Sequence, residues 1–498
     1  MAFPDSDPNV RSHVESHVFV FAALLGILLI THLPFISLPF FWDELGQFIP
    51  ASLDILHAGK LVPITTVPNV HPPGVMAFLA LAWKLFGYSI PVTRAAMLTL
   101  AAAGVYASFV LAIRMCRHVP GAPALGVVLL MFATPLFYMQ SMMAQLDMPA
   151  MVFTIIALVF FFDRRYILCA VACTALVLSK ETGAILPAIF GAWLLFRERR
   201  WREASYFMLP FLLLSAWLVL LKSVTGYWLG DPGFAHYNVG YSLSPVRASL
   251  ALLRRFWYIF AADFRWIGTI AIIYAWRRTK LFHTFEWMIA GVFFAAHMLL
   301  VSFFGGAVLE RYLLPVFPIF YIAAVTGFAV FAQTWRRVAI VAMLLGMVAG
   351  LYWNPPYPFP LENNLAMVDF VELQKATAEY LEREHPNATV ATAWPYTGAL
   401  YNPDVLFVHR RMKIIETSDF HYKSVADAVA FKHPDVLVVY SRTWEPPYSF
   451  LRFQWVEDLL RNHYEYEPQI TTEQVESLGM HPQFRFSQRG QWIEVYTK

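Results

Sequence analysis

Long apolar runs alternate with short polar segments over the first 353 residues of the chain. A helix needs about 20 mostly apolar residues to span a bilayer. Eleven runs fit this pattern to a useful degree: 17–38, 91–113, 121–140, 148–162, 167–180, 183–196, 205–222, 255–276, 286–304, 314–332 and 338–353. The pattern predicts a mainly α, polytopic membrane helical bundle of about eleven transmembrane helices. The first run has no small-residue cleavage site after a short apolar core, so we expect a retained anchor.

The segment 74–87 decides the predicted topology, because it is apolar but short and contains Lys84. If it spanned the membrane, the clusters Arg114/Arg117 and Arg164/Arg165 would face outward. As an amphipathic helix lying in the interface, it places every basic cluster on one side. These clusters are Arg114/Arg117, Arg164/Arg165, Arg197/Arg199/Arg200/Arg202, Arg277/Arg278/Lys280 and Arg336/Arg337. The positive-inside rule then predicts a cytoplasmic N-terminus and an external C-terminus.

A Pro-rich linker at 354–360 separates this region from a tail of different character. Residues 1–353 carry 24 basic and 15 acidic side chains, whereas residues 354–498 carry 13 and 19. The tail pattern predicts a helix at 365–383, then strands at 389–393, 405–408, 413–415 and 436–440, with helical stretches at 425–431 and 451–462. We therefore expect a transmembrane domain over 1–353 and a small extracytoplasmic α/β domain over 354–498.

Composition excludes several classes of protein. A hydrophobic content of 58% with only 14% charged residues is too apolar for a soluble enzyme of this size or for a disordered chain. The net charge of +3 gives no basic field for a nucleic-acid partner. The three cysteines, Cys116, Cys169 and Cys173, all precede the tail, so the tail has no disulfide of its own.

Ionisable residues gather at the predicted outer ends of the spans. Such groups are costly at membrane depth and are candidates for function. Because several separate junctions contribute them to one leaflet, they would line a shared cavity. The candidates are Asp43, Glu44, His71, Arg94, Asp147, Lys180, Glu181, Asp231, His236, Tyr237, Glu310, Arg311 and Tyr312.

Each candidate also has a purely structural interpretation. The pair Asp43-Glu44 could cap an interfacial helix, and Asp147 before Met148-Pro149 fits an N-cap. Lys180 and Glu181 could pair with each other at a short turn. Arg311 and Tyr312 could anchor the interface, and His71 and His236 could be ordinary loop histidines. The argument for function therefore depends on the co-location of these residues.

Sugar transfer from a lipid phosphate to a hydroxyl group would use such a set. The reaction needs a carboxylate that accepts the acceptor proton and cations that stabilise the departing phosphate. An aspartate near lysine, arginine and histidine side chains meets both needs. A lipid-linked donor also accounts for a site at one leaflet of a bilayer.

Several motifs recur in the order and spacing of a known family. They are 41–45 (FWDEL), 54–63 (DILHAGKLVP), 71–74 (HPPG), 85–87 (LFG) followed by Arg94, Asp147 before a span, 179–183 (SKETG) and 310–318 (ERYLLPVFP). On these motifs the chain resembles membrane glycosyltransferases of the C superfamily, in particular bacterial aminoarabinose transferases of lipid A and protein O-mannosyltransferases. The resemblance covers roughly residues 18–335 and implies a helical bundle with paired interfacial helices in the first outer loop.

The resemblance also implies roles for individual residues. Asp43 would be the acidic base with Glu44 beside it, and Lys180, Arg311 and His71 would bind the donor phosphate. The other residues expected to contact substrate are Arg94, Asp147, Glu181, His236, Tyr237 and Tyr312.

This sequence departs from the aminoarabinose transferases at two places. Those enzymes carry lysine where His71 stands, and a histidine is neutral over much of the physiological pH range. The first hypothesis is that His71 binds the donor phosphate. The subordinate hypothesis is that it coordinates a divalent cation. The arginine that follows their Asp-Glu pair is missing, since Leu45, Gly46 and Gln47 stand here, so we do not carry over the donor sugar.

The resulting hypothesis is an inverting glycosyltransferase of the bacterial inner membrane. It would transfer a hexose or pentose from a polyprenyl-phosphate donor, at the outer face, to lipid A, another envelope glycan or a protein, with membrane lipids and no nucleic acid as further partners. A flippase or transporter for a lipid-linked substrate is the first rival, disfavoured by the one-sided charges and by the lack of evident inverted repeats. An inactive scaffold that anchors the tail is the second.

Overall fold

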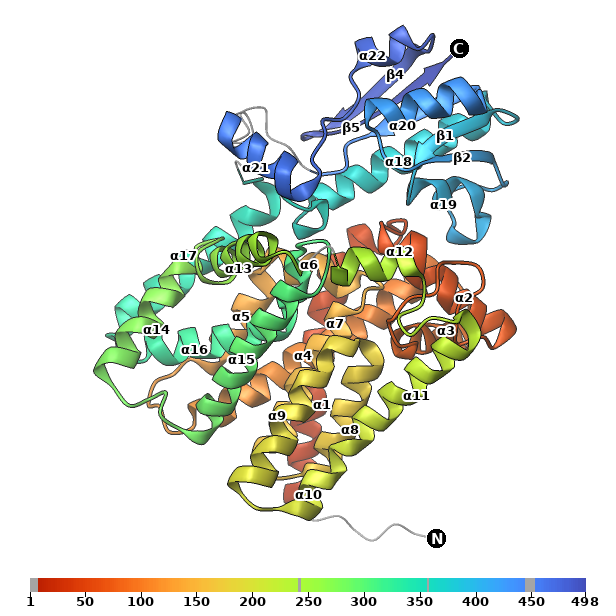
Figure 1. Ribbon diagram of the computed structural model, residues 1–498. Helices are drawn as coiled ribbons and strands as arrows, with labels where there is room; N and C mark the ends of the chain where they lie inside the picture. Colours follow the sequence, from red (N-terminus) through yellow and green to blue (C-terminus); the bar gives the residue numbers. More distant parts are fainter. Residues whose placement is uncertain (1–7, 241–242, 356–357, 444–452) are drawn as a thin grey trace.

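The structure, a computed structural model, describes residues 8–240, 243–355, 358–443 and 453–498. A helical bundle forms the larger part, and a small domain with a five-stranded sheet lies above it, at the end opposite to the N-terminus (Figure 1). This arrangement confirms the predicted fold class, a polytopic helical bundle followed by a small α/β domain.

The bundle is built from helices of very unequal length. They are α1 (Pro8–His32), α2 (Ile49–Ala58), α3 (Gly74–Phe86), α4 (Ile90–Cys116), α5 (Ala124–Ala133), α6 (Pro135–Met142), α7 (Asp147–Phe162), α8 (Tyr166–Ser179), α9 (Ile185–Ala192), α10 (Trp201–Tyr206), α11 (Met208–Thr225), α12 (Pro232–Ala235), α13 (Pro245–Phe260), α14 (Trp266–Arg278), α15 (Phe285–Phe303), α16 (Phe317–Phe328) and α17 (Gln333–Tyr352). Their ends follow local rules. Ser89 caps α4 by accepting from the backbone N–H of Val92, with a proline in the first turn, and Gly59 at φ +64° ends α2.

Within the described residues, six helices are long and apolar enough to cross a membrane, or seven if α5 and α6, which meet at 72°, form one broken span. The predicted spans 148–162 and 167–180 form the shorter apolar helices α7 and α8. The predicted single span 255–276 is wrong. Asp263 and Phe264 adopt positive φ angles of 49° and 63°, and this left-handed turn separates the Arg-rich helix α13 from α14.

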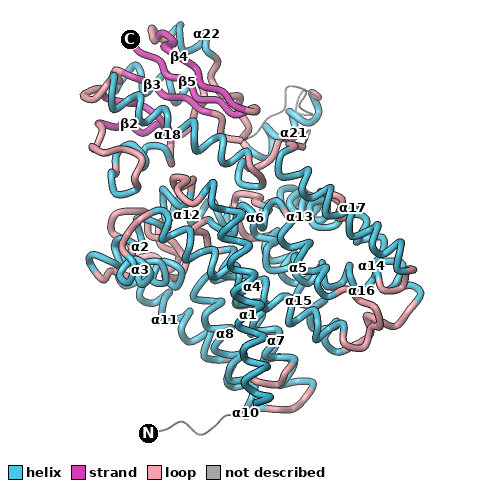
Figure 2. The backbone as a smooth tube through the Cα atoms, turned by 180° about the vertical axis from the view of Figure 1, so that it is seen from behind, coloured by secondary structure: helices cyan, strands magenta, loops and turns pink. Residues whose placement is uncertain are grey.

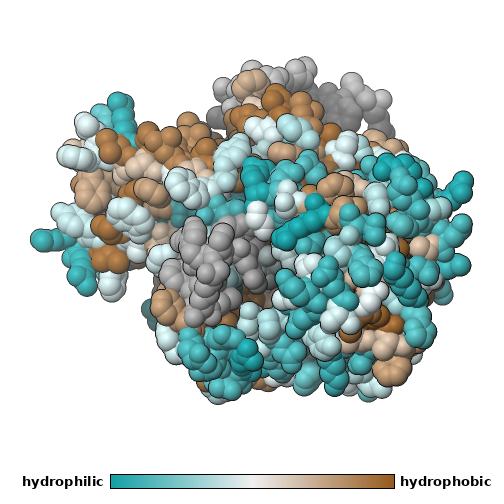
Figure 3. Space-filling view, turned by 90° about the horizontal axis from the view of Figure 1, so that it is seen from above, coloured by the Kyte–Doolittle hydropathy of each residue, from teal (hydrophilic) through white to brown (hydrophobic). Residues whose placement is uncertain are grey.

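The outermost helices present apolar side chains outward. Only 17% of the apolar window of α1 and 22% of that of α17 is buried within the protein, against 89% for the segment containing α16. Phe19, Leu212 and Leu345 are among the exposed side chains. Apolar faces of this extent suit contact with lipid. Seen from above, hydrophilic groups gather over the sheet domain, whereas the part of the bundle that projects to the left is more hydrophobic (Figure 3).

The basic clusters meet at the end of the bundle that is remote from the sheet domain. Arg114 pairs with Asp163 at 3.3 Å, Arg117 lies 4.0 Å from Glu286, and Arg336 donates to the carbonyl of Gly121. The helices α2 and α3 lie side by side at the opposite end (Figures 1 and 2). Segment 74–87 is therefore part of the first loop at that end, as its interfacial prediction requires.

The sheet domain follows a linker and a long helix, α18 (Ala366–Glu384). Its strands are β1 (Thr389–Ala393), β2 (Lys413–Thr417), β3 (Val436–Tyr440), β4 (His481–Gln488) and β5 (Gln491–Thr497), and its shorter helices are α19 (Tyr396–Tyr401), α20 (Tyr422–Asp427), α21 (Gln454–Tyr464) and α22 (Thr472–Ser477). The strand order is β2-β1-β3-β5-β4, with β1 parallel to β2 and β3, and β5 antiparallel to both of its neighbours (Figure 2).

Most elements predicted for the tail are present. The strands predicted at 389–393, 413–415 and 436–440 are β1, β2 and β3, and the predicted helices correspond to α18, α20 and α21; positions 451–452 lie outside the described residues. The strand predicted at 405–408 is wrong, because a short 3-10 turn at Pro403–Val405 is followed by Leu406 at φ +65°. The hairpin of β4 and β5 was not predicted.

Candidate active site

A cavity of about 780 Å³ lies between the bundle and the sheet domain. Both parts of the chain line it, the bundle through its outer loops and the tail through the linker and the ends of β1 and β3. Its charged lining residues are Asp43, His71, Asp147, Lys180, Asp231, Arg254, Arg311, Glu362 and Arg442. The structure thus brings together side chains that are up to about 400 positions apart in the chain.

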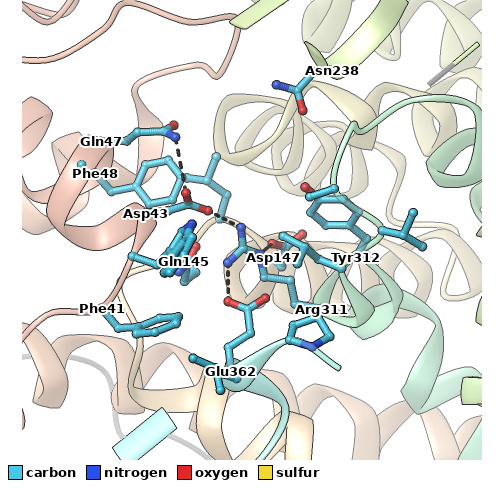
Figure 4. Close-up of a pocket in the computed structure, with 18 of the residues that line it drawn as sticks. Phe41, Asp43, Gln47, Phe48, Gln145, Asp147, Asn238, Arg311, Tyr312 and Glu362 are labelled. Carbon is cyan, nitrogen blue, oxygen red and sulfur yellow. Dashed lines mark hydrogen bonds and ion pairs between the residues drawn. The ribbon is translucent and has the colours of Figure 1, made fainter. Parts of the chain in front are cut away.

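Arg311 is at the centre of the charged cluster (Figure 4). It lies on the 3-10 helix Glu310–Val316 and is only 4% exposed. Its Nη1 donates to Glu362 at 2.6 Å, its Nη2 donates to Asp43, and its Nε lies 3.1 Å from the carboxylate of Asp147. One guanidinium therefore holds three carboxylates, from the first loop, from α7 and from the linker.

Lys180 adds a second cation to the same cluster. It follows α8 in an extended conformation, with its Nζ 2.5 Å from Asp147 and 4.0 Å from the centre of the Tyr312 ring. The suggested pairing of Lys180 with Glu181 is wrong, since Glu181 binds Nδ1 of His71 at 2.8 Å. The N-cap interpretation of Asp147 is also wrong, because this residue lies inside α7 and its side chain points to the two cations.

Hydrogen bonds to both carboxylate oxygens fix the orientation of Asp43. Gln47 donates to Oδ1 at 3.4 Å, and Arg311 binds Oδ2. The preceding residue, Trp42, has φ +46° and packs edge-on against Trp394 of the tail. This left-handed residue turns the chain so that Asp43 lines the cavity while Glu44 faces the protein interior.

Glu44 and Arg94, predicted as catalytic and substrate-binding, do not line the cavity. Both are fully buried and pair with each other. Glu44 also accepts from the backbone N–H groups of Phe41 at 2.8 Å and Ala144 at 2.6 Å, while Arg94 donates to three carbonyls, including that of Met142 at 3.1 Å. The pair fixes the loops that carry Asp43 and Asp147, which is a positioning role and not the helix cap considered above.

Removing one partner of this pair should be strongly destabilising, because an uncompensated charge would stay buried. We expect Arg94→Met to lower the free energy of unfolding by about 3–5 kcal/mol, measured by thermal unfolding in detergent micelles. The double variant Glu44→Gln with Arg94→Met should recover part of the loss. An Arg94→Met protein that keeps its stability but not its activity would instead indicate direct contact with substrate.

The second outer loop closes the cavity around His71. It meets the first loop at a bridge between Asn69 and Gly230, and Phe234 packs on the His71 ring at 5.7 Å. Burial raises the pKa of Glu181, but the opposing effects of His71 and Lys180 are together larger and bring it to about 2. Glu181 thus fixes the His71 ring from outside the cavity. Tyr237 and Tyr312 line the cavity, and His236 does not.

Several cavity residues were missed by sequence reasoning. Glu362 is a single charge just after the Pro-rich linker, and Gln145 precedes Asp147 by two positions. Gln145 is 1% exposed, and neither of its amide atoms has a hydrogen-bond partner within the described part of the chain. Trp394 and Arg442 come from the tail. The position of Glu362, as an isolated acidic residue next to the Pro-rich linker, was the signal in the sequence that could have identified it.

Glu362 lies outside the predicted spans, among the other charged groups of the cluster. Burial raises its pKa to about 7; Arg311 opposes this rise, whereas Asp43, Asp147 and Glu310 add to it. Arg311 and Lys180 face three carboxylates, Asp43, Asp147 and Glu362, and this excess of negative charge favours the protonated form of Glu362.

Stability should therefore depend on pH near neutrality. Between the ordinary pKa of 4.5 and about 7, the folded protein holds a proton at Glu362 that the unfolded chain has lost. Stability falls as pH rises through this window, by roughly 1 kcal/mol per pH unit. Unfolding midpoints between pH 5 and 8 should show this slope for wild type and a smaller one for Glu362→Gln; identical slopes would contradict it.

Comparison with known proteins identifies the fold. No protein-family model and no curated protein sequence matches the chain. Among solved structures, ArnT from Cupriavidus metallidurans bound to undecaprenyl phosphate matches with a TM-score of 0.55 and 14% identity, covering 96% of this chain and 97% of that one. The apo form of ArnT matches with a TM-score of 0.53 and 14% identity, covering 98% of each chain. The chain therefore has the fold of the ArnT structures, which confirms the expected resemblance at the level of the fold.

Proposed function

We propose that the chain is an inverting membrane glycosyltransferase that uses a polyprenyl-phosphate sugar as donor. The observation that carries this proposal is the cluster in which Arg311 and Lys180 meet Asp43 and Asp147 at one end of an apolar bundle. The ArnT structure with undecaprenyl phosphate supports a lipid-phosphate donor for this fold. The cavity would open to the outer face of a bacterial inner membrane, with the N-terminus cytoplasmic and the tail periplasmic. The acceptor would be lipid A, another glycan or a protein.

The charges can perform the reaction in one displacement. Arg311 and Lys180 stabilise the phosphate as the bond between its oxygen and the sugar C1 breaks. The acceptor oxygen bonds to C1 from the opposite face, which inverts the configuration, and Asp43 takes the proton from that hydroxyl. The products are the glycoside and polyprenyl phosphate, and Asp43 then releases its proton to solvent.

Donor binding requires a rearrangement of the cluster, because carboxylates engage Arg311 through its three nitrogens. A phosphate must replace at least one of them. Glu362 is the most suitable to leave, since its carboxyl holds a proton below about pH 7 and loses the least electrostatic energy when it separates from the guanidinium. Asp43 would stay in place beside the phosphate.

Transfer in proteoliposomes tests the proposal against its rivals. Purified protein would be reconstituted with a radiolabelled polyprenyl-phosphate sugar, chosen by comparing the lipids that accumulate in cells lacking the gene. We expect a labelled glycoside and free polyprenyl phosphate in equal amounts. Movement of intact donor across the bilayer without cleavage would support a flippase, and neither outcome would support a scaffold.

We also propose that the reaction needs no divalent cation. A metal ion in such a site would neutralise Asp43, Asp147 and Glu362 and would bind phosphate. Arg311 already lies between these carboxylates, so its guanidinium can take the place of the ion. Within the described ranges, no three His, Cys, Asp or Glu side chains are arranged to hold an ion. We expect treatment with EDTA to leave the rate of transfer unchanged. A tenfold loss that one divalent metal restores would overturn this proposal and return His71 to consideration as a ligand.

A further inference from the structure

A second cavity, of about 820 Å³, lies within the sheet domain. The hairpin of β4 and β5 forms one wall, and the segment that follows β3 together with residues 466–470 forms another. Arg442 and Thr443 line this cavity and also the candidate active site. The two cavities therefore share a wall. The guanidinium of Arg442 lies 5.8 Å from the centre of the ring of Trp42, the residue that precedes Asp43.

The second cavity is cationic. Arg442, Arg485 and Arg489 line it, against a single acidic residue, Glu467. Arg489 is held by the buried carboxylate of Asp369 at 2.5 and 2.7 Å, and Arg485 lies 3.1 Å from Glu494. No carboxylate in the described part of the chain pairs with Arg442. Carboxylates thus hold two of the guanidinium groups, whereas that of Arg442 lies near the Trp42 ring and could bind an anion.

Amide and aromatic groups complete the lining. Gln491 is fully buried, and both of its amide atoms lack a hydrogen-bond partner in the described ranges. Burial of an amide without a partner is unfavourable, and a ligand rich in donors and acceptors would remove this cost. Gln488 uses its nitrogen to bind Asp369 at 2.6 Å, and its oxygen can accept from a ligand. Trp492 adds an apolar ring that can pack on a sugar.

We infer that this cavity binds an anionic saccharide of the acceptor, and the inference rests on the glycosyltransferase function proposed above. Arginine recognises phosphate or carboxylate groups, the amides match sugar hydroxyls, and the volume is that of a small-molecule site. Arg442 in the shared wall would bring the acceptor from the sheet domain to Asp43. The lipid donor would occupy the first cavity, and the acceptor hydroxyl would reach Asp43 across the shared wall, so the two substrates would enter from different sides.

Binding of defined probes to the full-length protein tests this inference without turnover. The probes are chitobiose 1-phosphate, chitobiose and inorganic phosphate, measured by saturation-transfer NMR in detergent micelles. We expect Arg442→Gln and Trp492→Ala each to weaken binding of chitobiose 1-phosphate at least tenfold. Arg410→Gln, at an exposed position of the same domain, is the matched control and should bind like wild type. Unfolding curves of each variant would show whether the domain remains folded.

The probes and a kinetic measurement separate the outcomes. Chitobiose and phosphate alone should bind more weakly than their conjugate, and polyprenyl phosphate should not displace the conjugate. In transfer assays, Trp492→Ala should raise KM for the acceptor and leave KM for the donor unchanged. Unaltered binding in both variants, or equal binding of phosphate alone, would overturn the inference. Probe binding by a wild type that transfers no sugar would instead defeat the proposed function.

Discussion

Asp43→Asn is expected to reduce kcat for sugar transfer by about 10²–10⁴-fold, the range typical for loss of a general base. Asparagine has almost the same shape, and its single carbonyl oxygen can still accept from Arg311, so donor binding should change little. The loss should therefore appear in kcat and not in KM for the donor. Steady-state kinetics of the purified protein with a polyprenyl-phosphate sugar would measure both.

The matched control for this variant is Asp163→Asn at the other end of the bundle. Asp163 pairs with Arg114 at 3.3 Å and is partly exposed, remote from the cavity. Asp163→Asn should leave kcat within about twofold of wild type, because the residue is remote from the cavity. The fold should also remain intact, since an exposed ion pair contributes only about 0–1 kcal/mol to stability. If Asp43→Asn retained wild-type kcat, Asp43 would not be the base, and the assignment would pass to another carboxylate of the cluster.

Arg311→Met is expected to abolish measurable transfer and to destabilise the fold at the same time. The change leaves Asp43, Asp147 and Glu362 in mutual repulsion with only Lys180 to balance them. Breaking a buried ion pair in this way costs about 3–5 kcal/mol. Thermal unfolding in detergent and binding of polyprenyl phosphate would measure the two effects separately.

A second substitution distinguishes electrostatics from a packing defect. Adding Glu362→Gln to Arg311→Met removes one uncompensated carboxyl, so stability should rise while transfer stays absent. Arg117→Met, where the arginine lies 4.0 Å from Glu286 at the remote end, should cost less than about 1 kcal/mol. Wild-type stability in the Arg311 variant would show that the three carboxylates do not depend on the guanidinium.

The bundle could be predicted from sequence because its main determinants are local. Length and apolarity are sufficient to identify α4 and α15, and the basic clusters correctly placed α3 in a loop at the sheet-domain end. The break between α13 and α14 could not be predicted, since it depends on Asp263 and the buried Arg265, whose guanidinium donates to the carbonyl of Tyr258 at 2.5 and 2.8 Å. Both residues are compatible with a span if only average hydropathy is considered.

The convergence of residues next to recognisable motifs could be predicted from the sequence. Asp43, Asp147, Lys180 and Arg311 do converge, and His71, Tyr237 and Tyr312 line the same cavity. The pattern could not show that Glu44 turns inward to Arg94, because that depends on the φ of one residue, Trp42. It also could not place the tail residues at the site, because their approach depends on tertiary packing.

The contact between Glu362 and Arg311 has a consequence for how this chain can be divided. The Pro-rich linker resembles a boundary at which two modules could be separated or exchanged with those of a relative. Yet the residue just beyond it binds the central guanidinium of the bundle at 2.6 Å, and Phe370 of α18 packs against Phe41 at 5.9 Å. Fragments 1–353 and 354–498, expressed from separate genes, would each carry an incomplete site, and chimaeras joined at the linker would inherit mismatched halves. Since Trp394 and Arg442 of the tail also line the site, productive exchange would have to transfer the tail together with the outer loops that it contacts.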